Sequence, residues 1–161
     1  MIVVVMGVTG AGKTTVGSLL AAQLGWEFAD ADSFHSTSNL EKMSRGIPLT
    51  DADRAPWLAA MRFAIERWIS EKKSAVLACS ALKRSYRQEL LISSEVRLVY
   101  LRGSYESIAR QLRARHGHFA TEAILADQFA TLEEPEDATV IDVGKDPASM
   151  VAEIRTQLGL P

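Results

Sequence analysis

The sequence predicts an α/β fold: a three-layer αβα sandwich around a five-stranded, mostly parallel sheet. Three observations support this expectation. Five short apolar segments alternate along the chain with segments of helical periodicity. The first of them, 2–6, is apolar at every position, which is typical of a strand covered on both faces. A glycine-rich loop follows it directly. The chain has 161 residues and no repeat or linker, so we expect one domain, 1–161.

The elements follow from periodicity and from their flanking residues. Gly25 and Gly159 are placed to end helices, and Pro147 to begin one. We expect the strand at 26–29 to lie beside the first strand. We also expect Asp51 or Asp53 to cap the long helix. The strands are predicted at 2–6, 26–29, 75–79, 96–101 and 138–143, and the helices from the glycine-rich loop to 24, around 39–44, from about 51 to 69, at 82–91, 104–115 and 121–132, and from 146 to 158.

Aromatic residues recur along the long helix at spacings of three and four. Trp57, Met61, Ile65 and Trp68 share one face of it. A cofactor-binding stripe and a core stripe look alike at this level. The regular periodicity favours a core-facing helix.

Composition limits the classes of partner. The formal net charge is −2, so no overall positive field favours nucleic acid or an anionic membrane. No apolar run approaches the roughly 20 residues that a membrane-spanning helix needs. Cys79 is the only cysteine, which excludes an intramolecular disulfide and fits a reducing compartment. We therefore expect a cytoplasmic protein with Cys79 buried at a strand end.

The strongest functional signal lies at residues 7–14, Gly-Val-Thr-Gly-Ala-Gly-Lys-Thr, which match the phosphate-binding pattern G-x-x-x-x-G-K-[ST] in full. Glycines let the backbone curl so that successive N–H groups face one anion, and the following helix adds its dipole. Lys13 is predicted to reach the β and γ phosphates and Thr14 to bind Mg²⁺. The predicted ATP-binding residues are Gly7, Val8, Thr9, Gly10, Ala11, Gly12, Lys13, Thr14 and Thr15.

Two carboxylates end the second predicted strand. Asp30 and Asp32 would lie on the same side of an extended segment, with Ala31 opposite. Ligands bind at the carboxyl ends of parallel strands, so both belong near the phosphate loop. We expect Asp30 to hold Mg²⁺ through water and Asp32 to accept the proton of an attacking hydroxyl. Alternatively, one of them caps the next helix.

Further segments closely resemble the gluconokinase family, and together with the phosphate loop they run from residue 7 to 135. Thr14 stands where the family often has serine, which keeps the hydroxyl. These segments are Asp32–His35, Asn39–Met43, Gly46–Leu58, Cys79–Arg87, Arg115–Phe119 and Gln128–Pro135.

The resemblance implies a reaction. ATP and D-gluconate would give ADP and 6-phospho-D-gluconate, with Mg²⁺. It also implies a shikimate kinase-like or nucleoside monophosphate kinase-like P-loop fold, a short lid at about 115–125, and often a homodimer. Composition and periodicity alone indicate only a P-loop phosphotransferase.

A sugar acid needs fixed cations and several hydrogen-bond partners. Arg54, at a helix start, is placed to grip a carboxylate bidentately. Two alternatives stay open: Arg54 pairs with Asp51 or Glu41, and the basic residues at 83–87 form a solvated face. The predicted substrate-binding residues are Asp32, His35, Arg54, Lys83, Arg87 and His118.

Arginines precede Gly117 in a polar stretch between two helices. Arg110 and Arg115 are predicted to contact ATP or to close over it, with Arg115 stabilising charge in the transition state. Alternatively, they lie on a solvated helix face.

Two other functions of the protein remain possible alternatives. One is a kinase of another small acid or polyol, such as shikimate, on the same fold. The other is a non-catalytic nucleotide switch, although the chain lacks the Asn-Lys-x-Asp guanine-binding motif.

Overall fold

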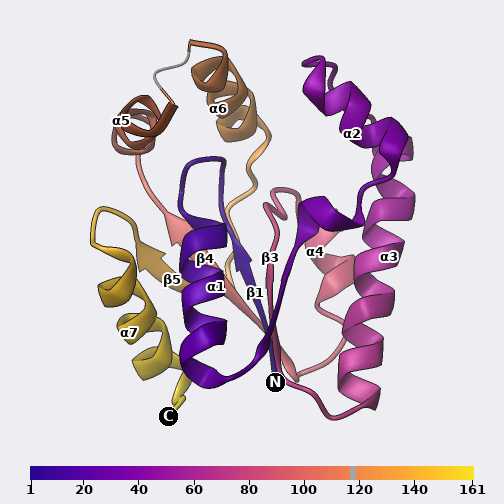
Figure 1. The fold of residues 1–161 in the computed structure, drawn as a ribbon, viewed down its shortest axis with the longest axis vertical. Helices are drawn as coiled ribbons and strands as arrows, with labels where there is room; N and C mark the ends of the chain where they lie inside the picture. The colour runs from indigo at the N-terminus through magenta and orange to yellow at the C-terminus, as the bar shows by residue number, and fades with distance from the viewer. Residues whose placement is uncertain (117–118) are drawn as a thin grey trace.

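The computed structural model describes residues 1–116 and 119–161, without the side chains of residues 115–121. It confirms the predicted alternation of strands and helices (Figure 1). The strands are β1 (Ile2–Met6), β2 (Glu27–Asp30), β3 (Ala75–Ala78), β4 (Val96–Arg102) and β5 (Thr139–Asp142). The helices are α1 (Lys13–Leu24), the 3₁₀ turn η1 (Ala31–Phe34), α2 (Thr37–Ser44), α3 (Asp51–Ser70), α4 (Arg84–Leu90), α5 (Tyr105–His116), α6 (Phe119–Thr131) and α7 (Pro147–Leu158).

All strand pairs in the described sheet are parallel, in the order β2-β3-β1-β4-β5. The fold class is confirmed, but the expectation that β2 pairs with β1 is wrong, because β3 lies between them. The burial of the two strands explains the order. Every residue of β3 is buried, whereas β2 carries the exposed Glu27 and only half-buried residues after it. A wholly apolar strand gains most from a central position, and a strand bearing charges tolerates the edge.

β1 supplies side chains to both faces of the sheet. Val3 and Val5 pack toward α1, α5 and α7, and Val4 and Met6 pack toward α3 and α4. This alternation is the period of a strand, and a strand covered on both faces is apolar at every position. The aromatic stripe of α3 belongs to the second of these cores, as predicted: Trp57, Met61, Ile65 and Trp68 are buried there.

Helix ends follow local side-chain chemistry. Thr50 is the N-cap of α3, with Asp53 completing a capping box through the Thr50 backbone N–H. The expectation that Asp51 or Asp53 is the cap is therefore wrong by one to three positions. Gly25 and Gly159 end their helices at φ 69° and 66°, as predicted. Asp146 caps α7 ahead of Pro147.

The strands deliver their following loops to one edge of the sheet. Figure 1 shows the loop between β1 and α1 at this edge, with the two chain termini at the opposite end. The segments after β2 and β3 reach the same edge, which is where parallel sheets bind ligands. α2 and the α5–α6 pair stand above it on either side. None of the helices in the described part of the chain has the length and apolar character needed to cross a membrane.

Candidate active site

The phosphate loop occupies residues 7–12, between β1 and α1. Gly10 and Gly12 adopt φ 81° and 97°, a left-handed conformation that residues with a side chain rarely take. Gly12 is the N-cap of α1 and has no side chain to cap the first N–H groups, so they stay available to a ligand. The loop thus turns backbone donors toward one place at a helix N-terminus, as the motif predicts.

Lys13 lies in the first turn of α1 and folds back over the loop. Its Nζ donates a hydrogen bond to the Val8 carbonyl at 3.0 Å. Burial lowers the pKa of the ammonium, while the carboxylates of Asp32 and Asp30 oppose that shift. The side chain is thus placed beside the loop with carboxylates within electrostatic reach.

The two residues predicted to hold a metal are in contact. Thr14 Oγ1 donates to Asp30 Oδ2 at 2.6 Å, although β2 is not adjacent to β1. A hydroxyl and a carboxylate next to a phosphate loop are the oxygen donors that a hard divalent cation prefers. Among the described residues no cluster of three His, Cys, Asp or Glu side chains could hold an ion alone. A cation here would need water and a bound phosphate as further ligands.

Asp32 does not continue the extended path of β2, so the expected alternation with Asp30 is wrong. Residues Ala31–Phe34 turn into a 3₁₀ helix because Asp30 caps it, accepting the Asp32 N–H at 3.0 Å. The alternative that one aspartate is a helix cap therefore holds for Asp30. The Asp32 side chain is exposed. It remains near the loop and His35, since its charge opposes the lowering of the pKa that burial causes at Lys13 and at His35.

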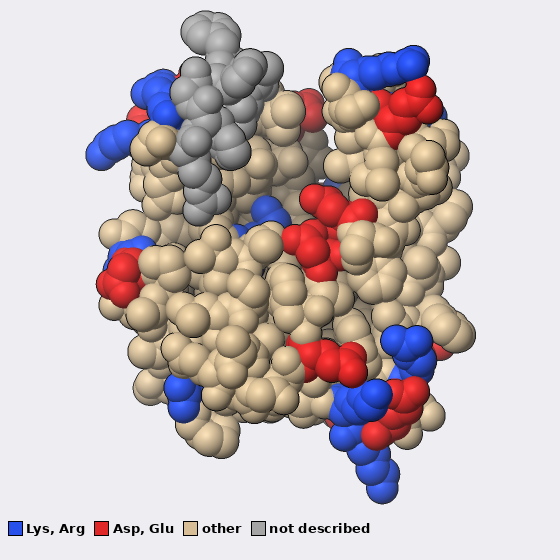
Figure 2. Space-filling model, viewed as in Figure 1, with Lys and Arg blue, Asp and Glu red and all other residues tan. Residues whose placement is uncertain are grey.

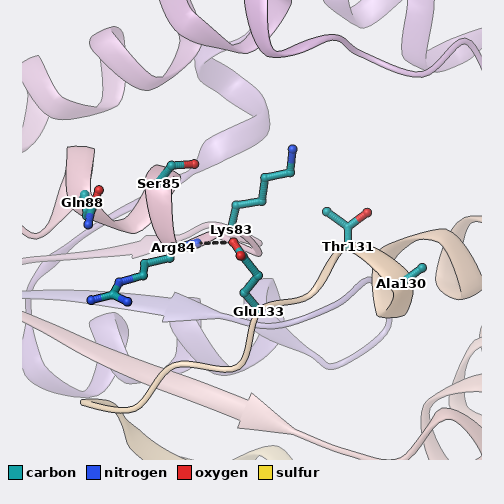
Figure 3. Close-up of a pocket in the computed structure, with 7 residues that line it drawn as sticks. All are labelled: Lys83, Arg84, Ser85, Gln88, Ala130, Thr131 and Glu133. Carbon is teal, nitrogen blue, oxygen red and sulfur yellow. Dashed lines mark hydrogen bonds between the residues drawn. The ribbon is translucent and has the colours of Figure 1, made fainter.

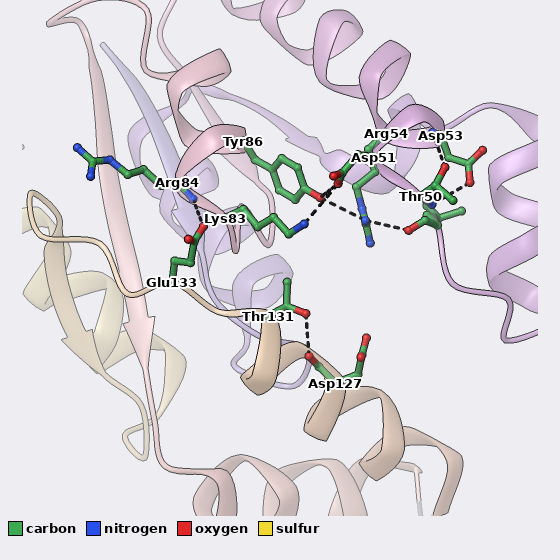
Figure 4. A network of polar contacts seen from close by, with 11 residues as sticks. Thr50, Asp51, Asp53, Arg54, Lys83, Arg84, Tyr86, Asp127, Thr131 and Glu133 are labelled. Atoms are coloured by element: carbon green, nitrogen blue, oxygen red, sulfur yellow. Dashed lines mark hydrogen bonds and ion pairs between the residues drawn. The ribbon is translucent and has the colours of Figure 1, made fainter.

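A polar network joins the start of α3 to the start of α4 (Figure 4). Arg54 donates to the Leu49 carbonyl at 2.9 Å and to Tyr86 Oη at 3.3 Å. Tyr86 donates in turn to Asp51 Oδ1 at 2.7 Å, and Lys83 pairs with the same oxygen at 3.4 Å. Among the described residues Arg54 forms no ion pair with Asp51 or Glu41, so that alternative is wrong; Glu41 pairs with Arg45.

Two cations share one aromatic ring in this network, and one of them, Lys83, also contacts Asp51. The Arg54 guanidinium and the Lys83 ammonium lie 5.7 and 5.5 Å from the centre of the Tyr86 ring. The Tyr86 hydrogen bond and the Lys83 charge lower the pKa of Asp51. Two positive charges against one negative leave a net positive site, which suits an anionic ligand.

The ring of His35 is fixed in one orientation beside this network. Its ring stacks on Trp57 at 4.4 Å between centroids, with 7° between planes. Asn39, only 5% exposed, donates to the Asp53 carbonyl at 2.8 Å and lies 3.3 Å from His35 Nδ1. Burial and the Arg54 charge lower the pKa of His35 despite Asp32, which favours the neutral ring. With Asn39 donating to Nδ1, the ring proton resides on Nε2.

Arg87 occupies a different environment from the other predicted cations. The side chain is buried at 6% exposure, and its Nη1 donates to the carbonyls of Ala81 and Leu82 at 2.8 and 3.0 Å. These bonds hold the loop after β3, where Ala81 takes a positive φ of 46°. The alternative of a solvated basic face is therefore wrong for Arg87. Its observed contacts position a loop and do not bring it together with Arg54.

Two recesses flank the network. An open one of about 660 Å³ lies where α4 begins and α6 ends, with the Lys83 side chain extending into it (Figure 3). Glu133 closes one side of it by accepting the Arg84 backbone N–H at 2.8 Å. The other, about 370 Å³, includes His35, Asn39, Asp53 and Trp57 in its lining. Figure 2 shows a hollow in the surface above the carboxyl edge of the sheet, between α2 on one side and α6 on the other.

Three predicted residues receive little structural information. His118 and the side chain of Arg115 lie outside the described residues, whereas residues 119–125 of the predicted lid form the start of α6. Arg110 is exposed on α5. Its neighbour Arg113 forms an ion pair with Glu122, which joins α5 to α6.

Sequence reasoning missed three residues of the site. Tyr86 links both substrate-side cations, Asn39 orients His35, and Gln128 contacts the phosphate loop. Tyr86 follows Lys83 by three residues, a spacing that places both on one side of a helix start, and this was the available signal. Asn39 and Gln128 act across the fold, so no local pattern reveals them.

Comparison with known proteins agrees with this geometry. The family model described as shikimate kinase matches residues 9–153. A probable gluconokinase of Xenopus tropicalis is 45% identical, covering 98% of this chain and 93% of that protein. The gluconokinase of Gluconobacter oxydans is 46% identical, covering 94% and 87%.

Solved structures point the same way. A gluconokinase from Sinorhizobium meliloti is 41% identical with a TM-score of 0.87, covering 98% of this chain and 90% of that one. A shikimate kinase from Aquifex aeolicus has 17% identity and a TM-score of 0.61 over 99% and 96% of the two chains, which shows a shared fold alone. The chain belongs to the gluconokinase family, a branch of the shikimate kinase-like P-loop kinases.

Proposed function

We propose that this protein transfers the γ-phosphoryl group of ATP to the 6-hydroxyl of D-gluconate, giving 6-phospho-D-gluconate and ADP. The observation that carries the proposal is the position of Asp32. Asp32 donates its backbone N–H to Asp30, which accepts from Thr14 beside the phosphate loop, and it lies three residues before His35, which stacks on Trp57, so one carboxylate lies between the two halves of the site. The high identity to gluconokinases supports the choice of acceptor.

The nucleotide half uses the loop from Gly7 to Thr15. Backbone N–H groups of the loop and the N-terminus of α1 bind the phosphates, and Lys13 leaves the Val8 carbonyl to neutralise charge on the transferred group. Thr14 and Asp30 would hold Mg²⁺, Asp30 through water. When bound, that ion would neutralise negative charge on the nucleotide phosphates.

The acceptor half prepares an alcohol for attack. As the bond from the substrate oxygen to the γ phosphorus forms, the bond to the β–γ bridging oxygen breaks. The hydroxyl proton passes to the Asp32 carboxylate, and the electron pair leaves with ADP. Its exposure on a short 3₁₀ turn leaves the Asp32 carboxylate accessible to a substrate.

The far end of the acceptor meets the cations. Arg54 and Lys83 would bind the gluconate carboxylate in competition with Asp51, and the Nε2–H of His35 would donate to a substrate hydroxyl. Arg87 contributes by holding the loop that carries Lys83. Arg110, Arg115 and His118 remain proposed contacts of the lid with ATP or substrate.

The proposal includes two properties of the whole protein. We propose a cytoplasmic enzyme, in line with its single buried cysteine, and a homodimer, as the family resemblance implies. Sedimentation velocity at micromolar concentration tests the dimer, and a purely monomeric protein would contradict it.

A substrate panel tests the proposed acceptor. We expect ADP release from MgATP to depend on gluconate and to be absent with shikimate, because the cationic network and His35 form a polar site for an open-chain acid. A coupled pyruvate kinase and lactate dehydrogenase assay measures this. Shikimate-dependent turnover would favour the other kinase, and tight GTP binding without acceptor-dependent turnover would favour a nucleotide switch.

Arg54→Ala is expected to raise the KM for gluconate about 10- to 100-fold, the effect of losing charge-assisted hydrogen bonds. The KM for ATP should change little, because Arg54 bonds to Leu49 and Tyr86 and not to the phosphate loop. Arg62→Ala, on an exposed turn of the same helix, is the matched control. Steady-state kinetics with each substrate varied in turn decide; an unchanged KM for gluconate would remove Arg54 from the site.

A further inference from the structure

The side chain of Gln128 reaches the phosphate loop from α6. Its Oε1 accepts the backbone N–H of Thr9 at 2.6 Å, across 119 positions of sequence. Both residues are half-buried, so this N–H has limited access to water and needs a protein acceptor. We propose that Gln128 is a positioning residue for the nucleotide: it fixes the first half of the phosphate loop in its anion-binding conformation. This inference rests on the proposed function of that loop.

The next residue of the loop, Gly10, contacts the other helix of the α5–α6 pair. A Cβ built on Gly10 would lie 2.6 Å from Leu112 Cγ and 3.2 Å from Ile108 Cγ2, so the Gly10 backbone packs directly against α5. Thr9 and Gly10 thus rest on α6 and α5 in turn. Gln128 supplies the polar contact and Leu112 the apolar one.

The two helices form a firm support for this contact. The rings of Tyr105 and Phe129 pack at 5.8 Å, and Arg113 pairs with Glu122. Leu125 is fully buried one turn before Gln128, which orients that face of α6 toward the core and the loop. Contacts between α5 and α6 therefore hold this support from both helices.

The residue type fits the task. Glutamine offers a neutral acceptor, whereas glutamate at the same reach would set a negative charge against a loop that binds a triphosphate. Asparagine is one methylene shorter and falls short of the Thr9 N–H. Methionine matches the length of glutamine and offers no comparable acceptor.

The test compares Gln128→Met with Gln128→Asn, which is polar but too short. Both are expected to weaken binding of a non-hydrolysable ATP analogue about tenfold, the effect of orphaning a half-buried N–H, and to lower kcat/KM for ATP to match. The KM for gluconate should change by less than about twofold. Asp127→Met, on the exposed neighbouring position of α6, is the matched control and should bind the analogue like wild type.

Calorimetric titration measures the affinity of each variant for the analogue, and thermal unfolding measures its Tm. A lowered Tm with unchanged analogue affinity in both variants would overturn the proposal and leave Gln128 a structural contact only. Equal losses for ATP and gluconate would also overturn it. If Gln128→Met does not fold, Gln128→Asn decides. If the wild-type protein binds the analogue but does not phosphorylate gluconate, the proposed function is wrong. The comparison of analogue affinities still tests the role of Gln128 in that case.

Discussion

Lys13→Ala is expected to lower kcat/KM for gluconate-dependent ADP formation by at least about 10²- to 10³-fold, the usual effect of removing one charge-stabilising donor. The reason is geometric. Among the described residues the ammonium bonds to the Val8 carbonyl only, so a bound triphosphate can take it without disturbing the core. Because burial already lowers the pKa of Lys13, a polyphosphate that restores a strong counter-charge should be bound tightly.

A coupled assay with purified variants measures this loss. Lys145→Ala removes an exposed lysine that pairs with Glu153 across the last loop, and it should retain full activity. The Tm of Lys13→Ala should stay close to that of wild type. Retention of most activity by Lys13→Ala would contradict the assignment of residues 7–14 as the ATP site.

Asp32→Asn is expected to lower kcat by about 10²- to 10⁴-fold, the range attributed to positioned general bases, with ATP affinity nearly unchanged. The Asp32 side chain is exposed, and its hydrogen bond to Asp30 uses the backbone N–H, which asparagine keeps. Asp30→Asn should behave differently. Its two oxygens accept from Thr14 and from the Asp32 N–H, so ATP binding in the presence of Mg²⁺ should weaken as well.

Single-turnover rates and calorimetric ATP titration separate the two effects. Asp137→Asn, at an exposed position before β5, is the control for a change of one charge. An equal loss of ATP affinity and turnover in Asp32→Asn would show that Asp32 serves the nucleotide and does not accept the hydroxyl proton.

The local parts of this structure could be predicted from the sequence. The phosphate loop is recognisable because glycine spacing, Lys13 and Thr14 all act within eight consecutive residues. The strand and helix positions follow from periodicity, and Gly25 and Asp146 mark helix ends, Gly25 by its left-handed backbone and Asp146 by its capping side chain. The prediction that Thr14 and Asp30 serve one metal site also has a local basis, since Thr14 begins α1 after the phosphate loop and Asp30 ends β2 at the same edge of the sheet.

The remaining features depend on contacts between distant segments. Strand order depends on which strands carry charged residues that need contact with water. The wholly apolar β3 therefore lies beside β1, and β2 lies at the edge. Asp32 left the expected alternation because Asp30 capped its N–H. In the sequence Arg87 is equivalent to Lys83 as a candidate substrate ligand. In the structure its guanidinium instead donates to carbonyl groups of the tight loop after β3. Gln128 acts through a loop 119 positions away, where no spacing rule applies.

The position of phosphoryl transfer on the acceptor tests the central claim most directly. Proton-coupled ³¹P NMR of the product formed from MgATP and gluconate distinguishes the primary 6-hydroxyl from the secondary ones. We predict a phosphomonoester resonance split by two protons, as the 6-phosphate requires. A resonance split by one proton, or inorganic phosphate alone, would contradict the account.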